Sequence, residues 1–194
     1  MSDHAIGEIM KTLTFPTFLI TVAISLSTAR AATPQIGAQA ALRTLPAHFA
    51  DHVVKLTADN GRPNPRRWYV LARNPQARRL LIKDPLYSIT IVGGHIAEAK
   101  RSLDARQIFE RRFIDLSKVR IDSGEAFEIA RNALGRRGEK MRSASYQLTQ
   151  RGPAADPIWE VWAYGKRDFY LGVVRLSATT GDIISSRKSW LPSF

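Results

Sequence analysis

A pattern in the middle of this chain returns in its last third. The letters WYVLA at residues 68–72 are matched 91 residues later by WEVWA at residues 159–163. A second match joins residues 94–101 to residues 181–188 at a distance of 87 residues, and both stretches begin with Gly-x-Ile and end on two basic side chains. Internal similarity is the strongest early guide to architecture. The repeat therefore predicts a duplicated strand-turn-strand unit.

The first 31 residues have the features of an export signal. Lys11 precedes the apolar run of residues 15–26, and Ala29-Arg30-Ala31 supplies the pair of small residues that a signal peptidase needs. The run is shorter than the roughly 18 apolar residues of a membrane span. We therefore expect cleavage near Ala31 and a periplasmic or secreted mature protein without a membrane span; a retained N-terminal anchor is the alternative.

The amino-acid composition limits the kinds of site and of partner that the chain can have. The chain has no cysteine and a net charge of +12, so thiolate metal sites are excluded and an exported form relies on an ordinary hydrophobic core. Basic residues gather in short clusters, among them 62/66/67, 136/137 and 187/188. Basic clusters beside aromatic residues also occur in proteins that bind nucleic acid. Their spread along the chain and the export signal make an anionic polymer of the envelope or an acidic protein face the better partner.

The second half has a clear order of elements. Asp122-Ser123-Gly124-Glu125 has the composition of a helix cap, and the apolar residues that follow predict a helix that ends before Gly135. Alternation and turn residues then predict four antiparallel strands over residues 141–149, 158–164, 169–177 and 182–187.

The first half shows a weaker version of the same order. We expect a loose lead-in over residues 33–43 and a helix that starts near Pro46 and ends at Asp59-Asn60-Gly61. Strands are expected over residues 67–73, 86–91 and 96–101, with a hairpin turn at Gly93-Gly94. No strand equivalent to residues 141–149 is evident.

From residue 123 to residue 187 the chain resembles a PepSY domain. The capped helix, the strand pattern around Trp159 and the apolar hairpin that closes on Gly181 carry the resemblance. It implies an α+β fold of duplicated helix-plus-antiparallel-sheet (PepSY/cystatin-like) modules, with an eroded copy in residues 32–120 and a clear copy in residues 121–194. PepSY domains occur in propeptides of secreted metallopeptidases and in cell-envelope proteins. The resemblance implies an inhibitory or regulatory role, without catalytic residues or a cofactor.

Candidate binding residues follow from strand alternation and from charge. Trp162 and Tyr164 lie on the strand face opposite Trp159 and Val161, so they are candidates for an exposed binding surface. Arg136 and Arg137 are the candidate residues for attracting anions.

One histidine pair is the only candidate for a catalytic metal site in the sequence. His48 and His52 have the spacing of two metal ligands on one helix face, with Asp51 where a zinc hydrolase motif has glutamate. A structural pair is the preferred interpretation, and no metal is expected.

The function predicted from the sequence is binding without catalysis. We expect an exported PepSY-like protein that modulates a peptidase or binds a peptide. A basic envelope protein that binds anionic polymers and a metal-dependent hydrolase using His48 and His52 are the alternatives.

Overall fold

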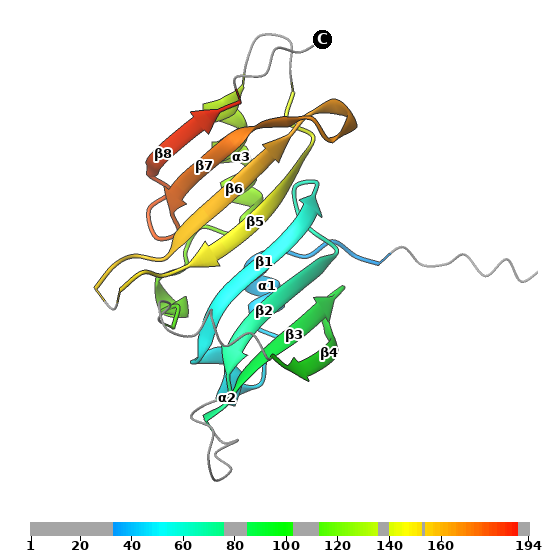
Figure 1. Ribbon diagram of the computed structural model, residues 1–194, viewed down its shortest axis with the longest axis vertical. Coiled ribbons are helices and arrows are strands. Elements are labelled where there is room, and N and C mark those ends of the chain that lie inside the picture. Colours follow the sequence, from blue (N-terminus) through cyan, green and yellow to red (C-terminus); the bar gives the residue numbers. More distant parts are fainter. Residues whose placement is uncertain (1–32, 76–84, 103–112, 136–139, 153, 190–194) are drawn as a thin grey trace, which may run out of the picture. The chain divides into compact units, whose positions relative to one another are not determined.

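The computed structural model describes residues 33–75, 85–102, 113–135, 140–152 and 154–189. Residues from Ala32 onward form a compact unit of their own. Within it, eight antiparallel strands form one sheet in the order β4-β3-β2-β1-β5-β6-β7-β8 (Figure 1). The strands are β1 Val53–Gly61, β2 Arg67–Arg73, β3 Leu86–Val92, β4 His95–Arg101, β5 Ser143–Thr149, β6 Ile158–Tyr164, β7 Tyr170–Ser177 and β8 Ile183–Lys188.

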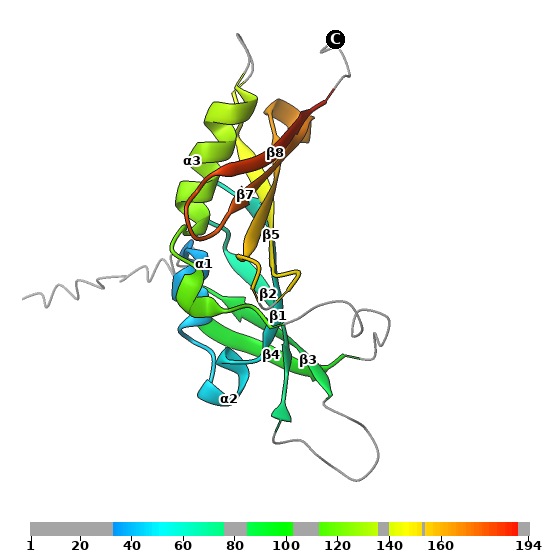
Figure 2. The same ribbon diagram turned by 90° about the vertical axis from the view of Figure 1, so that its left-hand side faces the viewer.

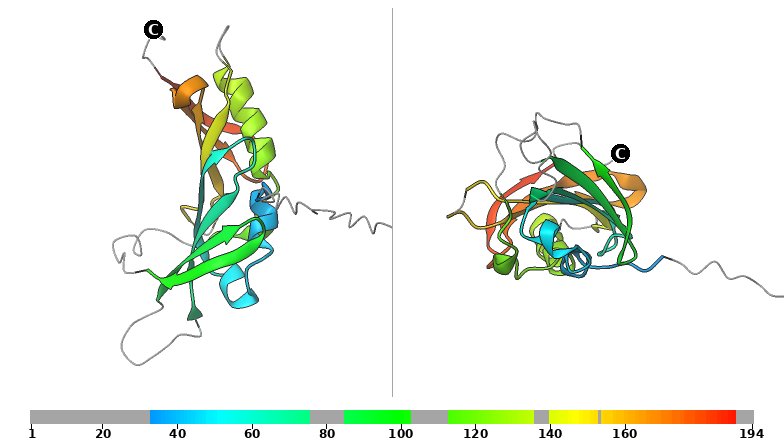
Figure 3. Two further views of the ribbon diagram at one scale, coloured as in Figure 1. Left: turned by 90° about the vertical axis from the view of Figure 1, so that its right-hand side faces the viewer. Right: turned by 90° about the horizontal axis from the view of Figure 1, so that it is seen from below.

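The α-helices of the described residues lie on one face of this sheet (Figures 2 and 3). They are α1 (Ala38–Leu42), α2 (Ala47–Ala50) and α3 (Ser123–Leu134). Seen along the strands, the sheet arcs around them, so the helices of the described residues leave its opposite face uncovered (Figure 3). In the part of the chain that the structure describes, no helix has the length and apolar character to cross a membrane.

The predicted class of duplicated helix-plus-antiparallel-sheet modules is wrong. The described residues form a largely β fold, one continuous eight-stranded sheet with little helix. The error begins in the first half, where one helix was expected from Pro46 to Asp59-Asn60-Gly61. Instead α2 stops at Ala50, and Val53 starts β1, which runs to Gly61. Val53 and Val54 are β-branched, and burial then alternates along the strand. This segment is the strand that seemed to be absent from the first half.

The other elements follow the sequence pattern more closely. The helix and the four strands expected in the second half are confirmed, as are the strands and the hairpin around Gly93-Gly94. The expected loose lead-in over residues 33–43 is wrong in part, because α1 lies within it. Residues 105–112, where the sequence allows a further helix, lie outside the described residues.

The centre of the core lies where β1 and β5 pair and join the two four-stranded halves. Trp68, Tyr146 and Trp159 pack against one another there, with ring centroids 5.9–6.3 Å apart. Each buried indole donates to a backbone carbonyl: Trp68 to Ile36 (3.0 Å) and Trp159 to Ile121 (2.9 Å). Both carbonyls immediately precede a helix cap, so the two halves repeat this contact.

The helices bury aromatic side chains against the sheet. Phe49 of α2 and Phe127 of α3 are both buried. Phe49 packs on Tyr87, with ring centroids 5.5 Å apart. The Asp122 carboxylate accepts a hydrogen bond from the amide of Ser123 (2.8 Å), so it caps α3 as its position predicted.

Both edge strands carry a local irregularity at equivalent positions. In β4 the register shift leaves Ala97 without a partner residue on β3, and in β8 it leaves Ile184 without one on β7. These residues are 87 apart, the spacing of the sequence repeat. Bulges and charged side chains on an edge strand disfavour pairing with a further strand. The basic residues near the ends of the two edges are Lys100, Arg101, Arg187 and Lys188.

Candidate functional site

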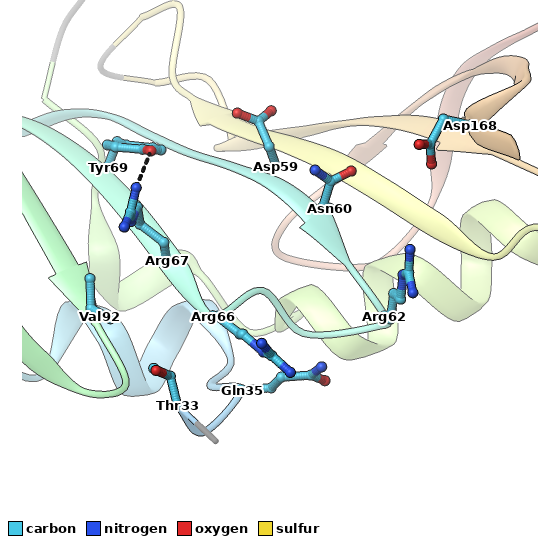
Figure 4. A pocket seen from close by; sticks show the side chains of 10 residues that line it. All are labelled: Thr33, Gln35, Asp59, Asn60, Arg62, Arg66, Arg67, Tyr69, Val92 and Asp168. Atoms are coloured by element: carbon cyan, nitrogen blue, oxygen red, sulfur yellow. Dashed lines mark hydrogen bonds between the residues drawn. The ribbon is translucent and has the colours of Figure 1, made fainter. Parts of the chain in front are cut away.

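A pocket of about 700 Å³ opens where β1 ends, β2 begins and β3 ends (Figure 4). The loop between β1 and β2 forms one wall, and the segment before α1 contributes Thr33 and Gln35. Asp168, from the loop between β6 and β7, reaches the same pocket from the other half of the sheet. The pocket therefore combines residues that are more than 130 positions apart in the chain.

Three exposed arginines make this pocket basic. Arg62 comes from the β1–β2 loop, while Arg66 and Arg67 stand at the start of β2. In the described part of the chain, the ion pairs are Glu98–Lys100, Glu128–Arg131 and Glu160–Arg175, and none includes a pocket arginine. The three guanidinium groups thus keep donors available for an anion.

Tyr69 extends the site along the uncovered face. Arg67 Nη1 donates to the Tyr69 hydroxyl (3.4 Å), and this bond raises the pKa of Arg67, which stays charged. Tyr69 also lines a second hollow of about 200 Å³ together with Lys55, Thr57 and Ser88. One aromatic side chain therefore stands between two neighbouring hollows on the same face.

The β1–β2 loop is held in place by buried groups. The Tyr146 hydroxyl donates to the Pro63 carbonyl, and burial raises the pKa of Tyr146 above its ordinary range, so the hydroxyl remains a donor. The Ser123 hydroxyl, at the start of α3, bonds to the Asn64 side chain (3.0 Å). The arginines of this loop are therefore carried by backbone anchored to both the sheet and α3.

The segment before α1 adds a further anchor. With its amide turned to donate, the Gln35 side chain bonds to the carbonyls of Asn64 (3.2 Å) and Arg62 (3.3 Å). The Ile36 amide donates to the Pro65 carbonyl (3.1 Å). Such prior fixation reduces the entropy that a binding site loses when it takes up a ligand.

Two carboxylates and an amide complete the lining. Asp59 is the last acidic residue of β1, and Asn60 and Asp168 have left-handed backbone, with φ of 56° and 57°. Residues other than glycine pay about 1–2 kcal/mol for this conformation, and Asn and Asp adopt it most readily. Against three arginines, these two acids leave an excess of positive charge. The pocket is therefore suited to a ligand that carries acidic groups.

Gly61→Ala tests the packing behind this loop. A Cβ at Gly61 would overlap the ring of Tyr146 and come within 2.6 Å of the Pro63 carbonyl oxygen. We expect a loss of about 1–3 kcal/mol in the free energy of unfolding, the usual effect of overpacking. Urea denaturation measures it. In the control Gly152→Ala, the added Cβ meets only Ala155 at 3.9 Å. Equal stability of the two variants would contradict the packing.

The predicted binding residues lie elsewhere. Trp162 and Tyr164 are half-buried on the uncovered face, opposite the buried Trp159, as alternation predicted. Tyr164 packs on Tyr170 with ring centroids 5.9 Å apart, and neither Trp162 nor Tyr164 lines the pocket. Arg136 and Arg137 lie outside the described residues.

The geometry of the histidine pair differs from the expected one. His48 is in α2, but this helix ends at Ala50, so His52 does not share its face. Each ring packs on a phenylalanine instead: His48 on Phe49 at 4.3 Å and His52 on Phe113 at 5.0 Å. Among the described residues, no three His, Asp or Glu side chains come together as metal ligands do.

Part of the pocket is visible in the sequence. Arg62, Arg66 and Arg67 form a basic cluster next to aromatic residues, but nothing in the sequence marks them as the wall of a site. Thr33 and Asp168 had no signal in the sequence, because only the tertiary fold brings them to the arginines. No family model, curated protein or solved structure matches this chain. The resemblance to PepSY domains therefore stays a prediction.

Proposed function

We propose that this chain is an exported, non-catalytic binding protein that holds an acidic segment of a partner protein or peptide. The observation that carries the proposal is the gathering of Arg62, Arg66 and Arg67 around one pocket on anchored backbone. Arginine forks bind carboxylates through paired, charge-assisted hydrogen bonds.

The dimensions support an extended ligand. Pockets that hold small ligands measure roughly 300–1,000 Å³, and the pocket of about 700 Å³ is followed by a second hollow on the other side of Tyr69. Lys55 in that hollow adds another cationic side chain. A ligand with several acidic groups in sequence would meet positive charge in both places. The net charge of +12 would speed its approach.

The partner class agrees with the role that the PepSY resemblance implies. An acidic surface or loop of a peptidase has the chemistry that this pocket complements. An anionic polymer of the cell envelope is the second candidate, favoured by the same three arginines and the same net charge. The two candidates differ in whether carboxylates on a peptide or repeated phosphates bind best.

Arg66→Ala/Arg67→Ala is the test of the pocket. We expect the double variant to weaken binding of a hexaglutamate peptide about tenfold or more, because hydrogen bonds to charged groups contribute roughly 1.5–3 kcal/mol each. Isothermal titration calorimetry measures the Kd, and linear hexaphosphate is titrated in parallel. Tighter, pocket-dependent binding of hexaphosphate would favour the polymer over the peptide.

The control removes the same charge from another place. Arg43 and Arg120 are exposed and line neither hollow, so Arg43→Ala/Arg120→Ala should change the Kd less than threefold by a general charge effect. Equal losses in the two double variants would show that net charge, not the pocket, holds the anion. A larger loss from Trp162→Ala, with little effect of salt, would place the binding on the apolar part of the face.

A further inference from the structure

Aromatic side chains form a patch on the uncovered face of the sheet. The patch consists of Trp162 and Tyr164 on β6 and of Tyr170 and Val173 on β7. In the strand register, Trp162 pairs with Val173 and Tyr164 pairs with Tyr170, so these side chains are neighbours on one face. Tyr170 is 36% exposed, and the other three are half-buried. The aromatic patch therefore offers apolar area that a ligand can cover.

The aromatic patch lies next to the arginine pocket. On β1, the pocket-lining Asp59 lies within the irregular stretch, between residues 58 and 61, that pairs with β5 around Ser145. Ser145 is paired in turn with Trp162 of β6. The pocket-lining Asp168 belongs to the β6–β7 loop, whose two ends carry the tyrosines of the patch. Two separate routes through the fold thus join the pocket to the patch.

Charge is distributed unevenly between the pocket and the patch. Arg66 and Arg67 are at the start of β2, away from the patch, whereas Asp59 and Asp168 lie on the side of β5 and β6 (Figure 4). Arg187 of β8 borders the patch on its far side, opposite Val173. Like charges repel, so carboxylates that bind the β2 arginines are disfavoured beside the two aspartates. A ligand that extends from the arginines toward the patch is best accommodated by an uncharged stretch.

We infer that the ligand is an acidic segment with an aromatic residue about four positions from its acidic group, and that this aromatic side chain binds to the aromatic patch. The inference rests on the proposed function. In the sheet order, β2 and β6 are separated by three strand spacings, about 14 Å at roughly 4.8 Å each. An extended peptide covers about 3.3 Å per residue. Four residues therefore bridge the distance from Arg67 to Trp162.

An aromatic residue fits this patch for a physical reason. Rings that meet edge-on or in offset stacks gain more than the burial of their area provides, and tryptophan and tyrosine are frequent at the centres of binding surfaces. Tyr164 and Tyr170 already pack in a tilted arrangement, with ring centroids 5.9 Å apart. This mutual packing limits the freedom that the two rings lose when a third ring binds.

The experiment uses two amidated peptides of equal charge. In the first, hexaglutamate is followed by three glycines and a tryptophan; in the second, a fourth glycine replaces the tryptophan. Isothermal titration calorimetry measures the Kd of each peptide. We expect the tryptophan to tighten binding to the unchanged protein about fivefold or more. Trp162→Ala should abolish this gain and leave the Kd of the glycine peptide unchanged, whereas Arg66→Ala/Arg67→Ala should weaken both peptides.

Two further variants test the position of the contact. Trp162→Phe keeps an aromatic ring, so it should retain most of the gain from the tryptophan. Leu71 is half-buried on the same face, but it lines the second hollow, on the other side of Tyr69. Leu71→Ala should therefore leave the gain unchanged. Loss of the gain in Leu71→Ala and not in Trp162→Ala would show that the ligand runs in the opposite direction and would overturn the inference.

The other outcomes separate this inference from the proposed function. If the unchanged protein binds both peptides equally while the double arginine variant weakens both, the inference is wrong and the pocket function stands. If sedimentation shows a dimer that Trp162→Ala converts into a monomer, the patch is an interface between copies, and the inference also falls. If neither peptide binds to the unchanged protein, the proposed function fails and this inference fails with it.

Discussion

Trp159→Ala is expected to lower the free energy of unfolding by about 3–5 kcal/mol, the usual loss when a large aromatic core residue is truncated. Trp159 is fully buried and packs on Trp68 and Tyr146 at the centre of the sheet. Its removal also leaves the Ile121 carbonyl without its indole donor. This cluster lies across the β1–β5 pairing that joins the two halves of the sheet, so both halves should unfold in one transition. Urea denaturation followed by circular dichroism measures this transition.

Trp162→Ala provides the matched control. Trp162 is on the same strand, three residues away, but it is half-buried on the uncovered face. Its truncation removes less buried area, so we expect a smaller loss of stability. If Trp162→Ala destabilised the protein as much as Trp159→Ala, the assignment of the two sheet faces would be wrong.

Gly172→Ala is expected to destabilise the fold by about 2–5 kcal/mol. Gly172 has a φ of 150°, which side chains rarely adopt, and an added Cβ would overlap the Arg187 carbonyl oxygen and lie 3.0 Å from Leu134 of α3. Overpacking costs roughly 1–3 kcal/mol, and unfavourable backbone adds about 1–2 kcal/mol. The added methyl group would lie where α3, β7 and β8 meet. Thermal and urea unfolding measure the loss of stability.

Gly165→Ala is the control for this position. A Cβ there makes only ordinary contact, 3.4 Å from the Leu171 side chain, and Gly165 has a negative φ. We expect its stability to remain close to that of the unchanged protein. Near-equal unfolding midpoints for Gly172→Ala and Gly165→Ala would mean that β8 is not packed on β7 as described.

The sequence predicted the elements whose signals are local. The capping residue Asp122, the hairpin glycines Gly93 and Gly94, and the alternation around Trp159 each mark an element within a few residues. The misread segment, residues 53–61, satisfied two periods at once, because its apolar residues fit a helix as well as a strand. Its state is decided by pairing with β5, about 90 residues away, which no local pattern contains. The alanine-rich α1 had good helix propensity but no clear apolar stripe.

The candidate site was less accessible to sequence reasoning. Clustering of Arg62, Arg66 and Arg67 was visible, but a cluster on a loop resembles any solvated basic stretch. Only the structure shows that this cluster forms the wall of a pocket: Tyr146 and Ser123 anchor the loop, and Asp168 approaches from the other half of the sheet. Aromatic alternation placed Trp162 and Tyr164 on the correct face, yet it gave no indication of where that face is hollowed.

The irregular edge strands have a consequence for how this molecule behaves at high concentration. An open sheet with two regular edges can grow by adding copies of itself, and growth of this kind leads to fibrils. Here the shifts at Ala97 and Ile184 interrupt the ladder that an incoming strand would follow, and the basic residues of two such edges repel. Neither edge therefore offers a regular ladder for a further strand, and a high concentration of this protein favours dispersed molecules over polymers.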